Sequence, residues 1–334
     1  MADARFLIVR LGSMGDIVHT LPAVSALRES FPEARIDWVV EAKWLPLLRG
    51  NPDVNEVIPV KRTSWTILRT CLGRLHAARY DCLLDFQGLY KSAALGWLSG
   101  TKKRIGWDRR VAREGGAAVF YTQHVVPTAA HIVDQNLELS RAAGARPGTV
   151  RFPLSSDAEA EREVENLLAT QGLKKFFVLS PGGGWRAKCW PPERYGELHR
   201  ALAQRFGVRG MVNYGPGEEP LAAAVREAAG QPEPIPAKLR LEQFVALMRR
   251  ATVLVGGDSG PLHVAVAVGT PVVGLYGPTD TARNGPYSKA DVVVRNARPD
   301  ETTYRRSDEY AASMLSITVE QVLAAVERRM EQVG

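Results

Sequence analysis

Residue types that could do chemistry gather in glycine-containing turns, each directly after a short apolar run. The first turn, Gly12 to Asp16, carries Ser13 and Asp16 three residues apart. A carboxylate held at the start of a helix could act as a general base. The same S-x-x-D spacing is also that of a helix cap, and a helix N-terminus lowers the pKa of a carboxylate and weakens it as a base. Spacing alone leaves both interpretations open.

The second turn joins three glycines to a lysine. Gly182, Gly183 and Gly184 follow an apolar run that ends at Ser180, and Lys188 precedes a helix expected from Pro192. Exposed main-chain N–H groups together with an ammonium group suit a diphosphate. A flexible glycine loop beside a surface lysine is the alternative.

The third turn is the most specific of the set. Its residues are Asp258, Ser259, Gly260, Pro261, Leu262 and His263. A serine N-cap followed by an early proline leaves free N–H groups and the positive end of a helix dipole, which favours an anion site. His263 could face the anion or be structural.

A further strand end carries Glu218 and Glu219 after Asn213. A carboxylate there could accept hydrogen bonds from a ribose diol, and helix capping explains it equally well. The chain contains no Asp-x-Asp or His-Glu-x-x-His pattern, so a metal is not indicated. It also lacks a P-loop and a G-x-S-x-G elbow.

Strands and helices alternate along the chain and must position these turns. Strands are expected at 6–9, 36–40, 56–60, 82–86, 176–180, 209–213, 252–256 and 271–275, and helices include 16–31, 157–170 and 318–332. This alternation predicts an α/β protein with parallel sheets covered on both faces. Ligands collect beyond the carboxyl ends of such strands, where the turns lie.

A Pro/Gly-rich stretch at 144–153 predicts a linker between two Rossmann-like halves. We expect a first domain at 1–150, a second at 151–315 and a C-terminal helix within 316–334 that crosses back to the first domain. Two facing halves would place a central cleft between them, and closure about the linker would bring two substrates together.

Composition excludes several protein classes. The chain has 334 residues, 45% hydrophobic and 24% charged, which excludes disordered, collagenous and small disulfide-rich proteins. The three scattered cysteines, Cys71, Cys82 and Cys189, suggest reduced thiols in a cytosolic protein. No apolar run is long enough to cross a membrane, and the N-terminus does not look like a signal peptide, so a soluble cytoplasmic protein is expected.

The net charge of +7 is concentrated in the first half. Residues 1–150 hold 20 Lys and Arg against 14 Asp and Glu, whereas 151–334 hold 23 against 22. Within 102–113, six basic residues accompany the single acid Asp108. Such a segment indicates an anionic partner, which could be nucleic acid, a membrane surface or an acidic substrate, unless it is only a solvated face. Nucleic acid is the least favoured of these because no accompanying motif is present.

Taken together, the motifs resemble those of glycosyltransferase family 9, the ADP-heptose:lipopolysaccharide heptosyltransferases. The resemblance is carried in order by the Gly12 to Pro22 start, Asp85-Phe-Gln-Gly-Leu-Tyr-Lys-Ser92, Lys188-Cys-Trp-Pro191, Asp258-Ser-Gly-Pro-Leu-His263 and Leu275-Tyr-Gly-Pro-Thr279. Ala112-Arg-Glu114, Phe120-Tyr121 and His131-Ile-Val-Asp-Gln135 look most like the heptosyltransferase I subgroup. The resemblance implies the GT-B fold, two Rossmann-like domains.

The resemblance also implies inverting transfer of heptose from ADP-heptose to Kdo on lipid A, without an obligatory metal and with a divalent cation at most auxiliary. Asp16 matches the general base, and Lys188 matches the lysine that neutralises the departing diphosphate. The remaining donor positions are Gly183, Gly184, Glu218, Leu239, Asp258, Ser259, Gly260, Leu262 and His263. Ser13, Arg62, Arg113 and His131 fall where the family binds its anionic acceptor.

Three stretches depart from the family pattern. The basic segment 102–113 carries more charge than the family pattern predicts. Gly182-Gly-Gly184 stands where familiar members have hydroxyl-bearing residues, and Arg283-Asn-Gly-Pro286 is unassigned. The expected protein is a monomer that contacts the inner membrane peripherally, because its acceptor is anionic and membrane-bound. A GT-B epimerase or hydrolase, or a non-catalytic module for nucleotide sugars or anionic glycolipids, remains an alternative.

Overall fold

The computed structural model describes residues 4–61, 65–146 and 148–332. Contacts within the chain divide it into two units, Met1–Ser155 and Ser156–Gly334. The division falls five residues beyond the expected boundary at 150. Each unit has its own sheet and its own core, and we describe each by itself.

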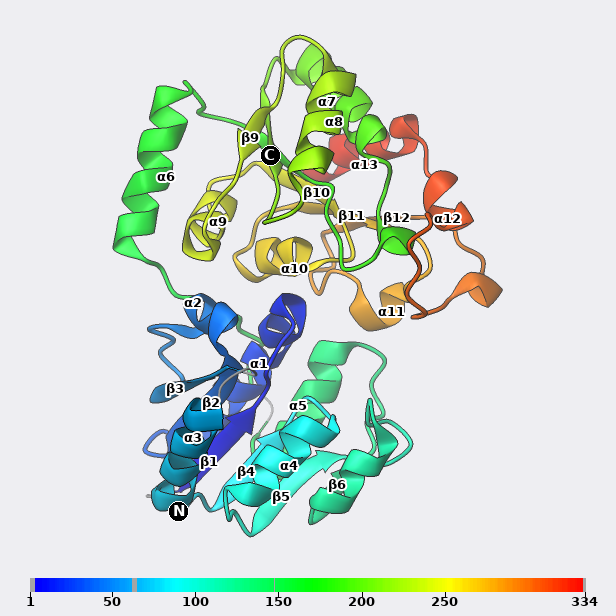
Figure 1. Cartoon of the computed structure of the whole chain (residues 1–334). Helices are drawn as coiled ribbons and strands as arrows, with labels where there is room; N and C mark the ends of the chain where they lie inside the picture. Colours follow the sequence, from blue (N-terminus) through cyan, green and yellow to red (C-terminus); the bar gives the residue numbers. More distant parts are fainter. Residues whose placement is uncertain (1–3, 62–64, 147, 333–334) are drawn as a thin grey trace. The chain divides into compact units, whose positions relative to one another are not determined.

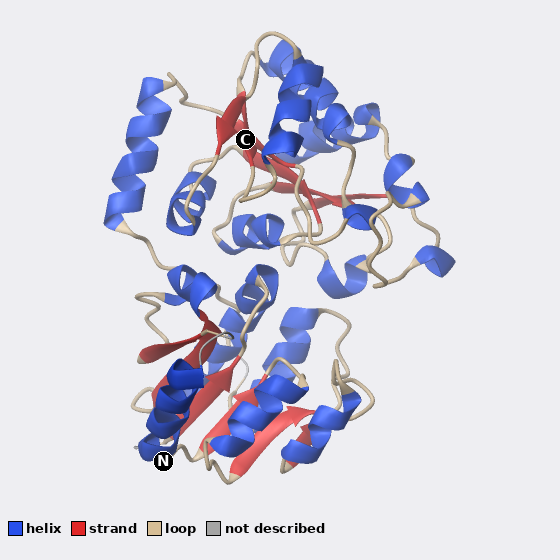
Figure 2. Ribbon diagram, viewed as in Figure 1, coloured by secondary structure: helices blue, strands red, loops and turns tan. Residues whose placement is uncertain are grey.

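The first unit contains a six-stranded parallel sheet in the order β3-β2-β1-β4-β5-β6 (Figures 1 and 2). Its strands are β1 (Arg5–Val9), β2 (Arg35–Glu41), β3 (Glu56–Val60), β4 (Cys82–Asp85), β5 (Lys103–Trp107) and β6 (Gln123–Val125). Its helices are α1 (Met14–Ser30), α2 (Leu45–Leu48), α3 (Trp65–Ala78), α4 (Tyr90–Leu98) and α5 (Ile132–Ala142), with 3₁₀ turns η1 (Ala42–Trp44) and η2 (Gly115–Phe120). Helix α1 packs against α5, and α3 packs against α4.

The second unit repeats this arrangement with a sheet in the order β12-β11-β10-β7-β8-β9 (Figure 1). Its strands are β7 (Phe177–Ser180), β8 (Gly210–Asn213), β9 (Ile235–Ala237), β10 (Val253–Gly257), β11 (Val272–Tyr276) and β12 (Val292–Arg295). Its helices are α6 (Ala158–Thr170), α7 (Pro192–Phe206), α8 (Glu219–Ala229), α9 (Leu241–Met248), α10 (Gly260–Ala267), α11 (Thr281–Asn284), α12 (Ala312–Leu315) and α13 (Val319–Glu331), with 3₁₀ turns η3 (Arg186–Lys188) and η4 (Pro299–Glu301).

The strand order creates one switch point in each sheet. In the first unit β1 pairs in parallel with β4, and in the second β7 pairs in parallel with β10. On either side of these pairs the chain winds in opposite directions, so the loops that follow the two strands diverge and leave room for a ligand. The loops after β1, β4, β7 and β10 are therefore the ones placed to form sites.

Both cores are built from strands that are buried on both faces. Leu7, Val9 and Leu83 belong to one buried cluster, and Leu179, Val255 and Leu275 belong to the other. Two-sided burial explains why these strands read as continuous apolar runs in the sequence rather than as alternating patterns.

The eight expected strands are present, with ends that differ by one residue at most positions. Four further strands, β5, β6, β9 and β12, were not expected. Strands β6 and β9 have only three residues each, too few to show a period, and β5 begins with two charged residues inside the basic segment. Part of that segment is thus a sheet strand rather than a solvated face.

One helix begins earlier than expected. Helix α1 begins at Met14, with Ser13 as its N-cap, two residues before the expected start at Asp16. Helix α13 packs against α7 and strands β10 to β12, and the expected crossing of the C-terminal helix to the first domain stays a prediction. No helix in the described part of the chain is long and apolar enough to span a membrane.

Candidate active site

Asp16 closes a capping box at the start of helix α1. The Ser13 main-chain N–H donates to Asp16 Oδ2 over 2.9 Å, and the Ser13 hydroxyl donates to the same oxygen over 3.1 Å. Arg10 Nη2 lies 2.5 Å from the other oxygen, Oδ1. The capping interpretation is therefore confirmed. The Asp16 side chain nevertheless keeps 27% of its surface exposed, so a hydroxyl group can still reach it.

Opposing effects set the pKa of Asp16. Burial raises it, but the charge of Arg10, the hydrogen bonds from Ser13 and the charge of Arg113 outweigh burial and hold the pKa below its ordinary value. The carboxylate is thus ionised at neutral pH and ready to accept a proton, although with a modest intrinsic basicity.

The loop after β4 holds the Asp16 turn in place across the switch point. Gln87 Oε1 accepts hydrogen bonds from the main-chain N–H groups of Leu11 (3.0 Å) and Gly12 (3.3 Å). Arg10 Nη1 donates to the carbonyl oxygen of Phe86. Two neighbouring strands thus fix both the turn and the arginine that pairs with Asp16.

Asp85 anchors that loop from inside the sheet. Its buried carboxylate accepts hydrogen bonds from the Gln87 main-chain N–H and from the Tyr121 hydroxyl, both over 2.8 Å. Burial dominates and raises the pKa of Asp85. The role of Asp85 is therefore to support the loop from behind.

The expected acceptor residues are only partly brought together. Ser13 contacts Asp16, and Arg113 lies close enough to lower its pKa. His131 caps helix α5 by accepting from the Val133 N–H over 3.2 Å, and its ring meets that of His19 on α1 at 6.2 Å. Arg62 lies outside the described residues.

In the second unit, the loops after β7 and β10 bring Lys188 to Asp258. Lys188 Nζ lies 3.8 Å from Asp258 Oδ2, and His263 Nε2 lies 3.2 Å from Asp258 Oδ1. Burial raises the pKa of Asp258, but the hydrogen bond with His263 and the charge of Lys188 prevail and lower it. Asp258 therefore carries the negative charge that positions the Lys188 ammonium group and also bonds the His263 ring.

The indole ring of Trp185 supports the same ammonium group. Lys188 Nζ lies 4.2 Å from the centre of the ring, and only 11% of the lysine side chain is exposed. Ring and carboxylate together restrict where the ammonium group can point.

Helix α10 presents its N-terminus beside this lysine. Ser259 is the N-cap, Pro261 lacks an N–H, and the His263 N–H is satisfied by Ser259 O at 3.4 Å. The N–H groups of Gly260 and Leu262 are thus the ones directed out of the helix end. The Leu262 side chain is fully buried, so only its main chain could meet a ligand. Ser259 Oγ is buried and has no hydrogen-bond partner among the described residues.

Glu218 lies against the glycine turn. Its Oε2 accepts from the Gly215 N–H over 2.8 Å, and Gly182 leaves the space in which its carboxylate sits, since a Cβ there would collide with it. Glu219 instead pairs with Lys238 at 2.7 Å on the surface. Of the two glutamates, Glu218 is the one at the turn.

The other glycines of the turn differ in what surrounds them. A Cβ at Gly183 would come within 2.7 Å of Cys189 Sγ, whereas one at Gly184 would meet Lys188 only at ordinary contact distance. Leu239 is half-buried between β9 and α9.

Sequence reasoning gave no role to four residues here: Arg10, Asp85, Gln87 and Trp185. A weak signal existed for Arg10, because a charged residue follows an apolar strand directly and precedes a glycine. The role of Gln87 depends on β4 lying next to β1, which only the fold reveals. Among the described residues, no group of three His, Cys, Asp or Glu side chains is arranged to hold a metal ion.

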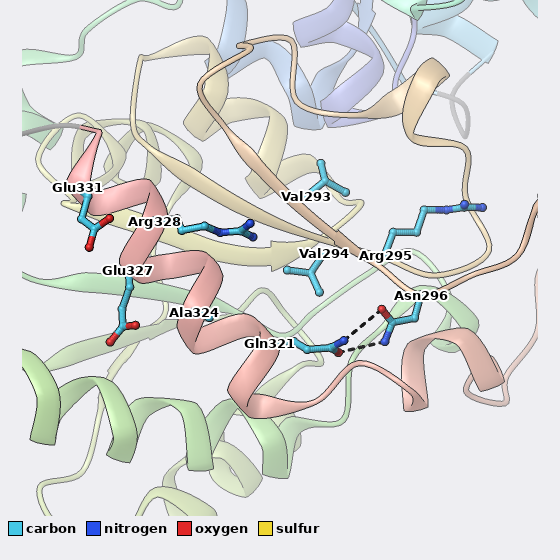
Figure 3. A pocket seen from close by; sticks show the side chains of 9 residues that line it. All are labelled: Val293, Val294, Arg295, Asn296, Gln321, Ala324, Glu327, Arg328 and Glu331. Atoms are coloured by element: carbon cyan, nitrogen blue, oxygen red, sulfur yellow. Dashed lines mark hydrogen bonds between the residues drawn. The ribbon is translucent and has the colours of Figure 1, made fainter.

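A groove of about 560 Å³ lies elsewhere, between edge strand β12 and helix α13 (Figure 3). The Asn296 side-chain amide donates a hydrogen bond to Gln321 Oε1 across the groove over 3.0 Å, and Arg328 and Glu331 also line the groove. None of the expected site residues lines this groove, and it lies far from the switch point in strand order.

Comparisons with known proteins all match this chain to heptosyltransferases of glycosyltransferase family 9. The profile of glycosyltransferase family 9 (heptosyltransferase) matches residues 69–313. Lipopolysaccharide heptosyltransferase 1 of Escherichia coli K12 is 33% identical over 308 residues, which is 88% of this chain and 94% of that protein. Lipopolysaccharide heptosyltransferase 1 of Pseudomonas aeruginosa is 30% identical over 88% of this chain and 84% of that protein.

Solved structures agree with the sequence relatives. The E. coli heptosyltransferase WaaC with ADP-2-deoxy-2-fluoro heptose superposes with a TM-score of 0.74 at 28% identity, covering 99% of this chain and 100% of that one. A family 9 glycosyltransferase from Veillonella parvula superposes with a TM-score of 0.86 at 22% identity, covering 98% of both chains. The two-sheet GT-B fold expected from the sequence is confirmed.

Proposed function

We propose a specific reaction for this chain, which belongs to glycosyltransferase family 9 and is a lipopolysaccharide core heptosyltransferase that uses ADP-heptose. The proposed reaction transfers L-glycero-D-manno-heptose to a Kdo residue of the inner core on lipid A. The observation that carries the assignment of roles is the position of the two residue clusters, one in each unit. Each lies at the switch point of its own sheet, one with a carboxylate and one with a cation and a helix N-terminus.

Asp16 is the general base in this proposal. Its free surface accepts the proton of the acceptor hydroxyl while the oxygen forms a bond to the anomeric carbon, and the bond from that carbon to ADP breaks. Attack from the side opposite the leaving group inverts the configuration. Ser13 and Arg10 support this role because they fix the direction of the carboxylate before the substrate arrives.

Lys188 and the N-terminus of α10 stabilise the departing ADP. The diphosphate gains negative charge as the bond breaks, and a preorganised ammonium group with two outward N–H groups meets that charge without moving. In this proposal no metal is obligatory, and a divalent cation is at most auxiliary. Ser259 Oγ, buried and without a partner among the described residues, is a further donor for a phosphate oxygen.

The rest of the donor lies along the carboxyl ends of β7 to β9. Glu218 accepts hydrogen bonds from the ribose diol, and Leu239 contacts the adenine. Gly183 and Gly184 offer main-chain N–H groups in place of side-chain hydroxyls. The order of these loops along the sheet supports this placement, since adjacent strand ends can follow one extended nucleotide.

The acceptor is anionic, and we assign its binding to Ser13, Arg62, Arg113 and His131 in the first unit. The excess of basic residues in 1–150 supports this assignment. We propose that the enzyme acts as a monomer on the cytoplasmic face of the inner membrane, where a Kdo-bearing lipid A would meet it.

The test measures release of ADP from ADP-heptose with and without Kdo-lipid A. Asp16→Asn retains an oxygen that can cap helix α1 but cannot take up the proton, so kcat should fall about 10²- to 10⁴-fold while the protein stays folded. The matched control is Asp157→Asn, which changes the N-cap of α6 in the same way and should leave kcat unchanged. Full activity in Asp16→Asn would remove Asp16 as the base, and ADP release that ignores the acceptor would indicate a hydrolase instead.

A further inference from the structure

Helix α4 turns an apolar face away from the sheet. Tyr90, Trp97 and Leu98 are 53%, 55% and 49% exposed, and their spacing of seven and eight residues places them along one side of the helix. The opposite side, including Ser92, is buried, and exposed Lys91 lies beside Leu98 on the outer side. A helix that covers a sheet usually presents polar residues to water, so this outer face requires an explanation.

The 3₁₀ turn η2 extends this face. Val119 is 78% exposed, and the ring of Phe120 lies 6.3 Å from that of Trp97. Arg104 in β5 joins the end of η2 to the loop that follows α4, because it donates to the carbonyl oxygens of Phe120 and Thr101, each over 2.6 Å. We call the resulting surface the α4–η2 face; it consists of Tyr90, Trp97, Leu98, Val119 and Phe120.

Positive charge lies at both ends of the α4–η2 face. Exposed Lys102 and Lys103 follow the C-terminal end of α4. At the other end, Arg109 packs against Gly115 at the start of η2, and Arg113 is exposed in the same loop. The nearby acid Glu114 is engaged with the Tyr90 main-chain N–H over 2.6 Å. The basic groups therefore dominate the field around the apolar residues.

The concentration of exposed apolar side chains is local. Of the eight large hydrophobic residues that are exposed in the described part of the chain, six lie between residues 90 and 126. Continuous apolar patches are uncommon on soluble proteins and mark interaction surfaces. Exposed Trp and Tyr beside Lys and Arg match the interface of an anionic bilayer, where aromatic rings lie at headgroup level and the cations meet phosphate groups.

We propose that the α4–η2 face docks the protein on an anionic lipid bilayer. Trp97, Val119 and their neighbours enter the headgroup region. Lys102 and Lys103 at one end, and Arg109 at the other, bind acidic headgroups. This goes beyond the proposed transfer reaction, because it assigns a lipid-binding surface that functions with no sugar donor or acceptor present. The basic segment indicated an anionic partner, and the apolar face supplies the component that distinguishes a bilayer from a soluble anion.

The test measures co-sedimentation of the full chain with vesicles of phosphatidylethanolamine and phosphatidylglycerol, and with pure phosphatidylcholine vesicles. We expect binding to the anionic vesicles and at least tenfold weaker binding to the neutral ones. Trp97→Ser with Val119→Ser should weaken binding about tenfold or more, and Lys102→Ala with Lys103→Ala about thirtyfold at low salt. The matched controls are Leu315→Ser and Lys174→Ala with Lys175→Ala, which remove similarly exposed groups from the second unit and should change nothing.

Equal binding of the wild type and both α4–η2 variants would overturn the proposal. So would a loss of binding in the lysine variant alone, since that would indicate a diffuse charge effect rather than a docked face. Circular dichroism confirms that each variant is folded. A protein that binds vesicles but transfers no heptose would refute the proposed function while leaving this surface intact.

Discussion

Trp185 should contribute to catalysis entirely through Lys188. The lysine ammonium group lies 4.2 Å from the ring centre and 3.8 Å from Asp258, with 11% of the side chain exposed. A cation over an indole in such a poorly hydrated place is worth about 1 to 2 kcal/mol. Trp185→Leu should therefore lower kcat/KM about 5- to 30-fold, because the ammonium group loses the position from which we propose that it meets the diphosphate.

The assay is ADP release at limiting ADP-heptose with saturating acceptor, measured in a double-mutant cycle with Lys188→Met. Lys188→Met alone should cost roughly 10²- to 10³-fold, as expected for loss of a preorganised group that meets developing charge. In the Lys188→Met background, Trp185→Leu should have almost no further effect, since the ring then has no cation to hold. Trp185→Phe keeps an aromatic face and should recover most of the loss.

Strict additivity of the two substitutions would refute this reasoning, because it would mean that Trp185 acts independently of the lysine. Arg306 provides the control. Its guanidinium lies 5.6 Å from the same ring but is exposed to solvent, so Arg306→Ala should change kcat/KM less than about threefold.

Two further outcomes are expected. Asp16 is held ionised with a lowered pKa, so the acidic limb of the kcat/KM profile should lie below the ordinary pKa range of an aspartate. Arg10→Met removes a stabilising charge and should move that limb to higher pH. A pH profile of Arg10→Met identical to that of the wild type would exclude the Arg10 ion pair as the cause of the lowered pKa. Gly182→Ala should raise KM for ADP-heptose about tenfold, since the added Cβ displaces the Glu218 carboxylate. A Cβ at Gly184 makes only ordinary contacts, so Gly184→Ala should change KM less than about threefold. Equal effects of the two substitutions in steady-state kinetics would show that Glu218 does not contact the donor.

The chain pattern predicted the elements that carry the site better than the elements at the sheet edges. Apolar runs such as Phe6 to Val9 lie in the centre of a parallel sheet. Because such strands are buried on both faces, they consist of consecutive apolar residues, and that pattern can be recognised in the sequence alone. Strands β6 and β9 lie at or near an edge and have three residues each, so neither length nor periodicity distinguishes them from loops.

The hydrogen bonding within each turn could also be predicted from the sequence. Ser13 and Asp16 lie within one helical turn, and Ser259 and Pro261 begin another, so their hydrogen bonding depends on neighbours in the sequence. The contacts that hold these turns in place from distant parts of the chain could not be predicted from the sequence. Gln87 reaches Leu11 across 76 residues, and Trp185 matters only because Lys188 and Asp258 meet beside it.

By itself, then, the sequence determined the family, the alternating α/β architecture and the residue types in each turn, because these depend on composition and on spacing over a few residues. Tertiary structure alone decided which turns meet. Parallel pairing of β1 with β4 and of β7 with β10 places loops from distant parts of the chain at common switch points. It also decided that α4 leaves its apolar side in water, because a helix buries whichever face its sheet and neighbours cover, and the remaining face becomes visible only when those neighbours are in place.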